Sequence, residues 1–201
     1  MNKADPASAG DPALLSIGHS THPIEVFVEL LRGHGVESVA DVRSTPFSRF
    51  NPQFNRQSLE RGLHATGIRY LFLGKELGGR PDGDRFYDHE GHVLYGRMAE
   101  SPTFESGLAR LVERAERSRV AVICSEENPS GCHRFLLVTR VLRDRGVEVV
   151  HIRGDGSTQR TEDVDAFQGW SDPVYEDASL LDGSVSSSWR STRPVTRGGG
   201  V

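Results

Sequence analysis

The stretch Ala121-Val-Ile-Cys-Ser-Glu-Glu-Asn-Pro-Ser-Gly-Cys-His-Arg134 decides the fold. A continuous apolar run, too short for most helices, stops at Cys124, and a polar loop with Asn, Pro and Gly follows. An amphipathic helix is then predicted to open at Cys132. A strand, a loop and a helix N-terminus form the place where α/β proteins bind anions and carry out chemistry. The loop holds more reactive groups than a connection needs, so the stretch predicts where a site lies.

The remainder of the chain alternates between short apolar strands and amphipathic helices. Strands are predicted at 14–18, 36–42, 68–73, 120–124 and 147–152. Helices are predicted from Pro23 to Gly33 and over 56–65, 102–118 and 132–145, while residues 74–100 are expected to be irregular. This alternation predicts an α/β domain of three layers, with a mainly parallel sheet of about five strands and helices on both faces.

Composition sets the domain limits. Residues 1–12 are small and polar and are interpreted as a disordered lead-in, residues 13–157 as a single α/β domain, and residues 158–201 as a largely disordered tail. Ser-, Arg- and Gly-rich segments in the tail bury too little apolar surface to offset the entropy of ordering. A short docking segment is the alternative, because the tail also contains apolar side chains, namely Trp170, Tyr175, Leu180, Leu181 and Trp189.

Charge and cysteine content exclude several classes of protein. The 24 basic and 28 acidic residues give a net charge of −4, which shows no global basic excess for nucleic-acid binding. No apolar run approaches transmembrane length, so no membrane partner is expected. The two cysteines do not make a secreted disulfide framework, and we expect free thiols in a reducing cytoplasm. The chain has neither a P-loop nor a dinucleotide fingerprint, and no cofactor is predicted.

Parallel strands end at one edge of a sheet, so the polar residues that follow them should converge. His19 and Ser20 follow the first strand, Asp41 and Arg43 the second, and Glu126 the fourth. His19 is either a loop histidine or a general acid/base, and Ser20 either caps the next helix or binds an anion. Asp41 and Arg43 form a bracing ion pair, or Arg43 holds a phosphate or carboxylate beside Asp41.

Two further features carry alternatives. The loop 44–55 interleaves Phe residues with Arg49, which suits stacking on a base or packing of its aromatic rings onto the core. At the predicted helix start, the dipole lowers the pKa of the Cys132 thiol and favours a thiolate nucleophile. A metal site is not predicted, because Cys124 and Cys132 lack finger-like spacing and the side chains of Cys132 and His133 should diverge.

Four motifs together resemble the domain of unknown function 488 family. They are Ser16-Ile-Gly-His-Ser20, Asp41-Val-Arg43, Gly67-Ile-Arg-Tyr70 with Leu77-Gly-Gly79 behind it, and Ile123–Arg134, and they span about residues 14–152. Ser125 stands where Ala is common in the last motif. The resemblance implies an α/β domain whose Asp-Val-Arg and Cys-His-Arg elements coincide with the predicted edge, and it implies no activity.

The leading hypothesis is an enzyme that acts on a nucleotide or nucleic acid by hydrolysis or group transfer. Arg43 and Arg134 would bind phosphate, and Glu126, with Asp41 or His133, would serve as acid/base. Other predicted catalytic or substrate-binding residues are His19, Cys132, Ser20, Arg49, Tyr70 and Ser125. The second hypothesis is a non-catalytic module that binds the same kind of anionic ligand, and the third is thiol chemistry at Cys132. The sequence does not predict the oligomeric state.

Overall fold

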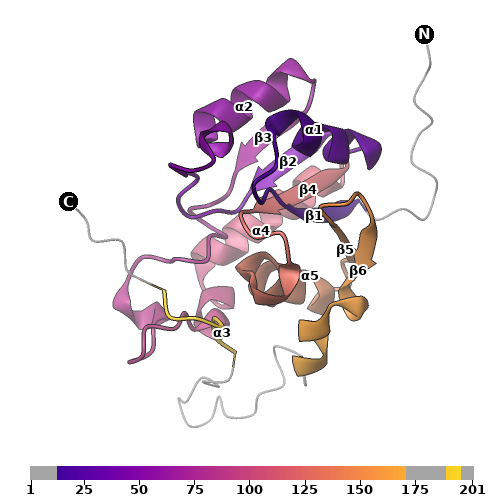
Figure 1. The fold of residues 1–201 in the computed structure, drawn as a ribbon. Coiled ribbons are helices and arrows are strands. Elements are labelled where there is room, and N and C mark those ends of the chain that lie inside the picture. The colour runs from indigo at the N-terminus through magenta and orange to yellow at the C-terminus, as the bar shows by residue number, and fades with distance from the viewer. Residues whose placement is uncertain (1–12, 171–188, 196–201) are drawn as a thin grey trace.

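A computed structural model describes residues 13–170 and 189–195, and it confirms the α/β class (Figure 1). In the described residues, six strands form one sheet in the order β3-β2-β4-β1-β5-β6. The strands are β1 (Leu14–Gly18), β2 (Ser38–Asp41), β3 (Arg69–Phe72), β4 (Val120–Cys124), β5 (Val149–Ile152) and β6 (Thr158–Arg160). The first five pair in parallel, and β6 pairs antiparallel with β5. The predicted lead-in 1–12 lies outside the described residues.

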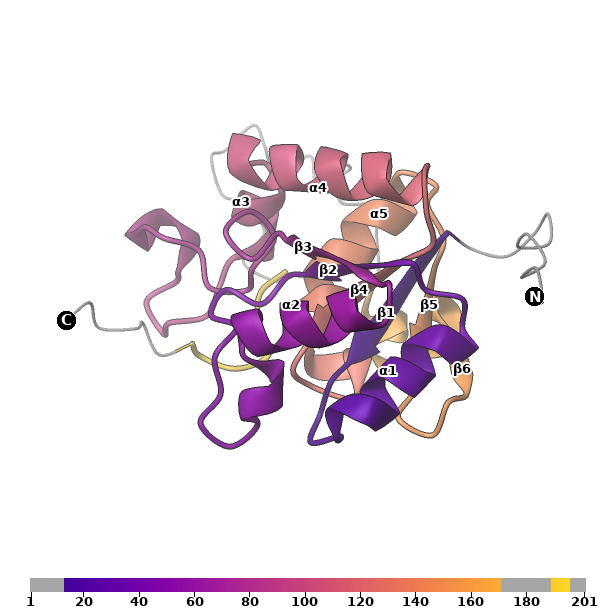
Figure 2. The ribbon, with the colours of Figure 1, turned by 90° about the horizontal axis from the view of Figure 1, so that it is seen from above.

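Helices cover both faces of the sheet, as Figure 2 shows from above. On one face lie α1 (Ile24–Gly33) and α2 (Arg56–Ala65), and on the other lie α4 (Pro102–Ala115) and α5 (Arg140–Asp144). The apolar spacing of each helix explains its orientation, since positions three or four apart share one side of a helix. In α4, Phe104, Leu108 and Leu111 are buried, and in α1, Phe27 and Leu31 are buried. The sheet thus separates two apolar cores.

Central strands are buried without alternation because both of their faces are covered. Every residue of β1, β2 and β4 is buried. The edge strand β3 is exposed or half-buried throughout. The carboxyl ends of β1, β2 and β4 therefore lie in the middle of the sheet, with layers of helices on either side.

The segment 74–100 contains more regular structure than its Gly and Asp content predicts, since α3 (Tyr95–Ala99) lies within it. Short 3-10 helices span Pro52–Phe54, Asp84–Phe86, Pro129–Gly131, Thr161–Asp163 and Asp165–Gly169. The predicted helix at 132–145 starts later, as a π-helical segment at Arg134–Thr139 that continues into α5. Within the described part of the chain, no helix has the length and apolar character needed to cross a membrane.

Parts of the segment 158–201, predicted as a largely disordered tail with docking as the alternative, pack on the domain where the structure describes them. Residues 158–160 form β6, and Trp170 packs against Phe135 with ring centroids 4.5 Å apart. In the segment 189–195, the Trp189 indole donates a hydrogen bond to the Leu136 carbonyl at 2.8 Å. Arg190 forms an isolated antiparallel β-bridge with Leu94. Apolar anchors within a polar composition explain this docking, which the sequence admitted as the alternative. Tyr175, Leu180 and Leu181 lie outside the described residues.

Candidate functional site

Three neighbouring strands end together at the carboxyl edge of the sheet. In the parallel register, Gly18 of β1 faces Cys124 of β4, and β2 ends at Asp41 beside β4. The pairing continues past the strands, since the His19 amide donates to the Cys124 carbonyl at 2.9 Å. The prediction that His19, Asp41 and Glu126 share one edge is confirmed.

Asp41 and Arg43 form a closed ion pair inside this edge. The Arg43 Nε donates to Asp41 Oδ1 at 2.8 Å and Nη2 donates to Oδ2 at 2.6 Å, in bidentate geometry. The Tyr70 hydroxyl donates to the same Oδ2 at 2.7 Å. Burial, with the Asp41 charge adding to it, raises the pKa of Tyr70 above its ordinary value, so the phenol stays a donor. Asp41 is fully buried and Arg43 is 5% exposed. We call this buried, hydrogen-bonded ion pair the brace.

His19 completes that brace. Its Nδ1 lies 2.8 Å from the Ser20 carbonyl and its Nε2 lies 3.0 Å from Arg43 Nη1. The neutral ring therefore donates from Nδ1 and accepts at Nε2. Burial and the neighbouring Arg43 charge lower the pKa of His19 to about 4, and its ring stacks on Phe54 at 4.2 Å. With both ring nitrogens engaged, His19 positions Arg43 and is not free to serve as a general base.

Ser20 has a backbone role that the sequence did not indicate. Its φ of 49° lies in the left-handed region, and its amide donates to the Ser125 carbonyl at 2.9 Å. The alternative that Ser20 caps the following helix is wrong, because α1 begins after Pro23 with no side-chain cap. Proline at this position supplies a suitable φ and has no amide that needs an acceptor.

Arg134, which was predicted to bind phosphate together with Arg43, does not open to solvent at this edge. Arg134 is only 1% exposed, and its guanidinium donates to the carbonyls of Glu126 at 2.5 Å and Glu127 at 2.7 Å. These bonds hold the loop that follows β4 against the end of β1. Only glycine fits there, since a Cβ at Gly18 would come within 1.7 Å of the Glu126 carbonyl oxygen.

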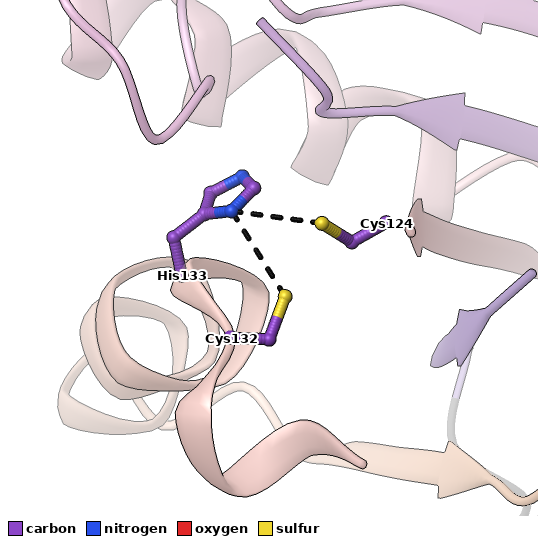
Figure 3. A group of neighbouring side chains, drawn as sticks. All are labelled: Cys124, Cys132 and His133. Carbon is purple, nitrogen blue, oxygen red and sulfur yellow. Dashed lines mark hydrogen bonds between the residues drawn. The ribbon is translucent and has the colours of Figure 1, made fainter. Parts of the chain in front are cut away.

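Two thiols and an imidazole converge on the neighbouring strand end (Figure 3). The Nδ1 atom of His133 lies 3.6 Å from Cys124 Sγ and 3.9 Å from Cys132 Sγ, and the three atoms lie within 4.8 Å of one another. The prediction that the side chains of Cys132 and His133 diverge is wrong. Cys132 is extended, with φ −97° and ψ 139°, because the helix starts only at Arg134. We call Cys124, Cys132 and His133 the sulfur cluster.

The other nitrogen of His133 determines how the ring faces the sulfurs. His133 Nε2 lies 3.0 Å from the Val42 carbonyl, which can only accept, so Nε2 carries the proton. The Nδ1 lone pair is therefore directed at Cys124 and Cys132. It can accept a thiol proton or bind a metal ion.

The pKa values of the two thiols are shifted in opposite directions. A hydrogen bond from Cys132 lowers the pKa of Cys124, and the nearby Arg134 charge lowers it further. Burial raises the pKa of Cys132, and the adjacent Cys124 sulfur raises it more. These directions favour Cys124 over the predicted Cys132 as the thiolate of the pair. Both cysteines are free, as predicted.

The loop after β2 divides its aromatic residues between core and surface. Phe54 is fully buried, whereas Phe47 is 70% exposed and Phe50 is 82% exposed. The Arg49 guanidinium lies over the Phe50 ring at 5.1 Å from its centroid. Packing onto the core is thus confirmed for Phe54, while stacking on a base by Phe47 or Phe50 stays a prediction.

Other groups at this edge were missed by the sequence argument. A cavity of about 560 Å³ opens between the loop after β4 and the β5–β6 hairpin, where Glu127 accepts two hydrogen bonds from Arg153 at 2.9 Å. Gly79 packs against the His133 ring, since a Cβ there would meet His133 Cγ at 2.7 Å. Ser125 and Glu126 themselves are exposed.

Comparison with known proteins identifies the family. The family model described as Domain of unknown function DUF488 matches residues 23–141, more than half of the chain. Neither a curated protein nor a solved structure matches.

Proposed function

We propose that this chain, which belongs to the DUF488 family, is an enzyme that acts on a nucleotide or nucleic acid by hydrolysis or group transfer. The reaction takes place at the carboxyl edge of the sheet, where β1, β2 and β4 end together. The two free thiols support a reducing, cytoplasmic setting.

Exposed aromatic rings carry the proposal. Phe47 and Phe50 are exposed to solvent, whereas Phe54 in the same loop is buried. Flat rings beside a guanidinium are a platform on which bases stack, and every base offers such a face. Arg49, over the Phe50 ring, adds a positive charge for the backbone phosphates. The loop leaves the sheet directly after Asp41 and Arg43, so a stacked base places its phosphates near the strand ends.

The reacting groups are the accessible ones at this edge. Asp41 and His19 are buried with their polar atoms engaged, so they hold the frame. Glu126 is exposed and acts as the acid/base, and the exposed Ser125 hydroxyl beside it binds substrate. The half-buried His133 lies beside Cys124, the last residue of β4.

A binding assay with three ligands tests the substrate class. A labelled single-stranded oligonucleotide, a mononucleotide and inorganic phosphate are titrated into the full chain. We expect Phe47→Ala and Phe50→Ala each to weaken oligonucleotide binding about tenfold, because base–aromatic stacking contributes about 1–3 kcal/mol per base. Val26→Ala is the matched control, since Val26 is an exposed apolar residue on α1. Equal affinities for all three variants would contradict the proposal.

Catalysis is tested separately from binding with Glu126→Gln. An enzyme should lose turnover of the bound oligonucleotide or nucleotide while retaining its affinity, since the amide keeps the shape of the carboxylate but cannot transfer the proton. Loss of product formation is measured by chromatography of the reacted ligand. If the parent chain binds the ligand but converts none, the chain is a non-catalytic binding module.

A further inference from the structure

We propose that the sulfur cluster is a binding site for a divalent transition-metal ion of borderline softness, with Zn²⁺ as the ion that its ligands suit best. The ligand atoms are Cys124 Sγ, Cys132 Sγ and His133 Nδ1. This site goes beyond the proposed function and does not depend on it, because its evidence comes from other residues.

The distances between the ligand atoms fit tetrahedral coordination. With Zn–S bonds of about 2.3 Å and Zn–N bonds of about 2.0–2.1 Å, a sulfur and a nitrogen ligand lie about 3.6 Å apart. The two sulfur–nitrogen separations are 3.6 Å and 3.9 Å. All three atoms lie within 4.8 Å of one another, so a metal ion can bind without rearrangement of the backbone.

The surroundings of His133 orient it as metal-binding histidines are oriented. A histidine ligand commonly donates its second ring N–H to a carbonyl or carboxylate, which fixes the tautomer and the ring. Here the Val42 carbonyl accepts that bond at 3.0 Å. The backbone of Gly79 packs on the same ring, where a Cβ would come within 2.9 Å of Nδ1. The lone pair is therefore held toward the sulfurs from two sides.

Burial favours a metal ion over a thiolate nucleophile. Cys124 is 7% exposed and Cys132 is 2% exposed, so neither sulfur presents itself to a bulky substrate. A nucleophile would need one sulfur and one base, whereas the imidazole lies near both sulfurs. Two thiolates balance the charge of one divalent ion. Three protein ligands leave a fourth position for water, as in catalytic zinc sites.

Titration of the metal alone tests the proposal without any assay of activity. The reduced full chain is treated with a chelator and titrated with Co²⁺, followed by competition with Zn²⁺. We expect one equivalent to bind, with a thiolate-to-cobalt charge-transfer band and the visible spectrum of a tetrahedral ion. Release of at least one proton per ion at pH 7 should accompany binding, because thiols bind metals as thiolates.

Variants separate this site from adventitious binding by the other histidines. Cys132→Ser and His133→Gln should each weaken binding at least tenfold, and His64→Gln, on the surface of α2, should not. Gly79→Ala should weaken it through the ring of His133 alone, while Gly33→Ala should not, because nothing lies within 4 Å of a Cβ there. Binding that persists unchanged in Cys132→Ser and His133→Gln overturns the proposal.

A measurement on the parent chain covers variants that fail to fold. Over an exposure long enough for local opening to label both cysteines of the metal-free chain, Zn²⁺ should protect them from alkylation by iodoacetamide, as read by mass spectrometry of the intact reduced chain. Alkylation at the same rate with and without Zn²⁺ would also overturn the proposal.

Discussion

Two polar clusters adjoin Val42 at the carboxyl edge, and they differ in how fully their hydrogen-bonding groups are used. In the brace, both Asp41 oxygens and both His19 nitrogens have partners from the protein. In the sulfur cluster, the Nδ1 acceptor of His133 faces two thiols at distances longer than a strong hydrogen bond. The hydrogen-bonding groups of the brace are therefore already used by the protein, whereas the sulfur cluster has three ligand atoms available.

This difference shows why reactive residue types alone do not identify a reactive site. Asp, Arg, His and Tyr at converging strand ends look like acid/base machinery, yet saturation of their hydrogen bonds makes them a rigid support. A support of this kind has a use, because functional groups act from fixed positions. Substitutions in the two clusters test this division, and the largest effect is expected in the brace.

Removal of the Asp41 charge from the brace should cause the largest loss of stability. Asp41→Asn leaves the Arg43 guanidinium buried without its counter-charge, and breaking a buried ion pair in this way lowers the free energy of unfolding by about 3–5 kcal/mol. Urea denaturation followed by circular dichroism measures the loss. Asp82→Asn, at an exposed aspartate, is the control and should change stability by less than about 0.5 kcal/mol. A loss at Asp41 no larger than that of the control would show that the pair is not a brace.

Arg134 should be the next most costly residue to replace. Arg134→Met retains the apolar stem but leaves the carbonyls of Glu126 and Glu127 without their charged donor, which we expect to cost about 2–4 kcal/mol. The same denaturation experiment applies, with the exposed Arg49→Met as the matched control. If phosphate stabilises the parent but not Arg134→Met, the Arg134 guanidinium binds anions and does not only hold the loop after β4.

The sequence was sufficient for the edge but not for the orientation of its side chains. Apolar runs that stop at Gly18 and Cys124, and alternation with amphipathic helices, predict the sheet and its carboxyl edge because period and burial are local properties. Whether Arg134 faces outward depends on the loop after β4 and its close approach to Gly18, which is a tertiary contact. No pattern in the sequence carries that information.

The sulfur cluster was missed for a related reason. Adjacent side chains diverge on a helix, and the spacing argument placed Cys132 and His133 on one. The chain enters its helix two residues later, after an extended Cys132, so the two side chains reach the same point. The strand β6 was missed because its exposed and half-buried residues carry no apolar signal.

Acid should destabilise the folded chain through its buried histidines. Burial, with the Arg134 charge adding to it, lowers the pKa of His151 to about 3, and its Nδ1 lies 2.6 Å from the Ser16 hydroxyl oxygen. The unfolded chain takes up this proton near pH 6.5 and the folded chain does not. The stabilisation is therefore complete above pH 6.5 and is lost as the pH falls toward 3, by about 2 kcal/mol between pH 7.5 and pH 5. His19 acts in the same direction.

Unfolding by urea at those two pH values measures this slope. His151→Gln should flatten it by about 2 kcal/mol. The exposed His64→Gln is the control and should leave the slope as it is. A slope identical in all three chains would mean that His151 is protonated in the folded state.

Cys132→Ser should have the smallest effect on the metal-free chain. The serine hydroxyl can still donate toward His133 Nδ1, so we expect a loss of about 1 kcal/mol in reducing buffer with chelator present. Differential scanning calorimetry at pH 7.5 provides the comparison. A loss as large as that of Asp41→Asn would make the sulfur cluster a second brace.

One measurement tests the division of roles most directly, namely the change in the free energy of unfolding on addition of Zn²⁺. At a hundred times the dissociation constant, binding to the folded state alone stabilises by about 2.7 kcal/mol. The parent chain and Asp41→Asn should both gain this amount, because the brace holds no ligand atom, and Cys132→Ser should gain almost none. If Cys132→Ser gains as much as the parent, or if the parent gains nothing, the sulfur cluster is not a metal site and the division between brace and sulfur cluster fails.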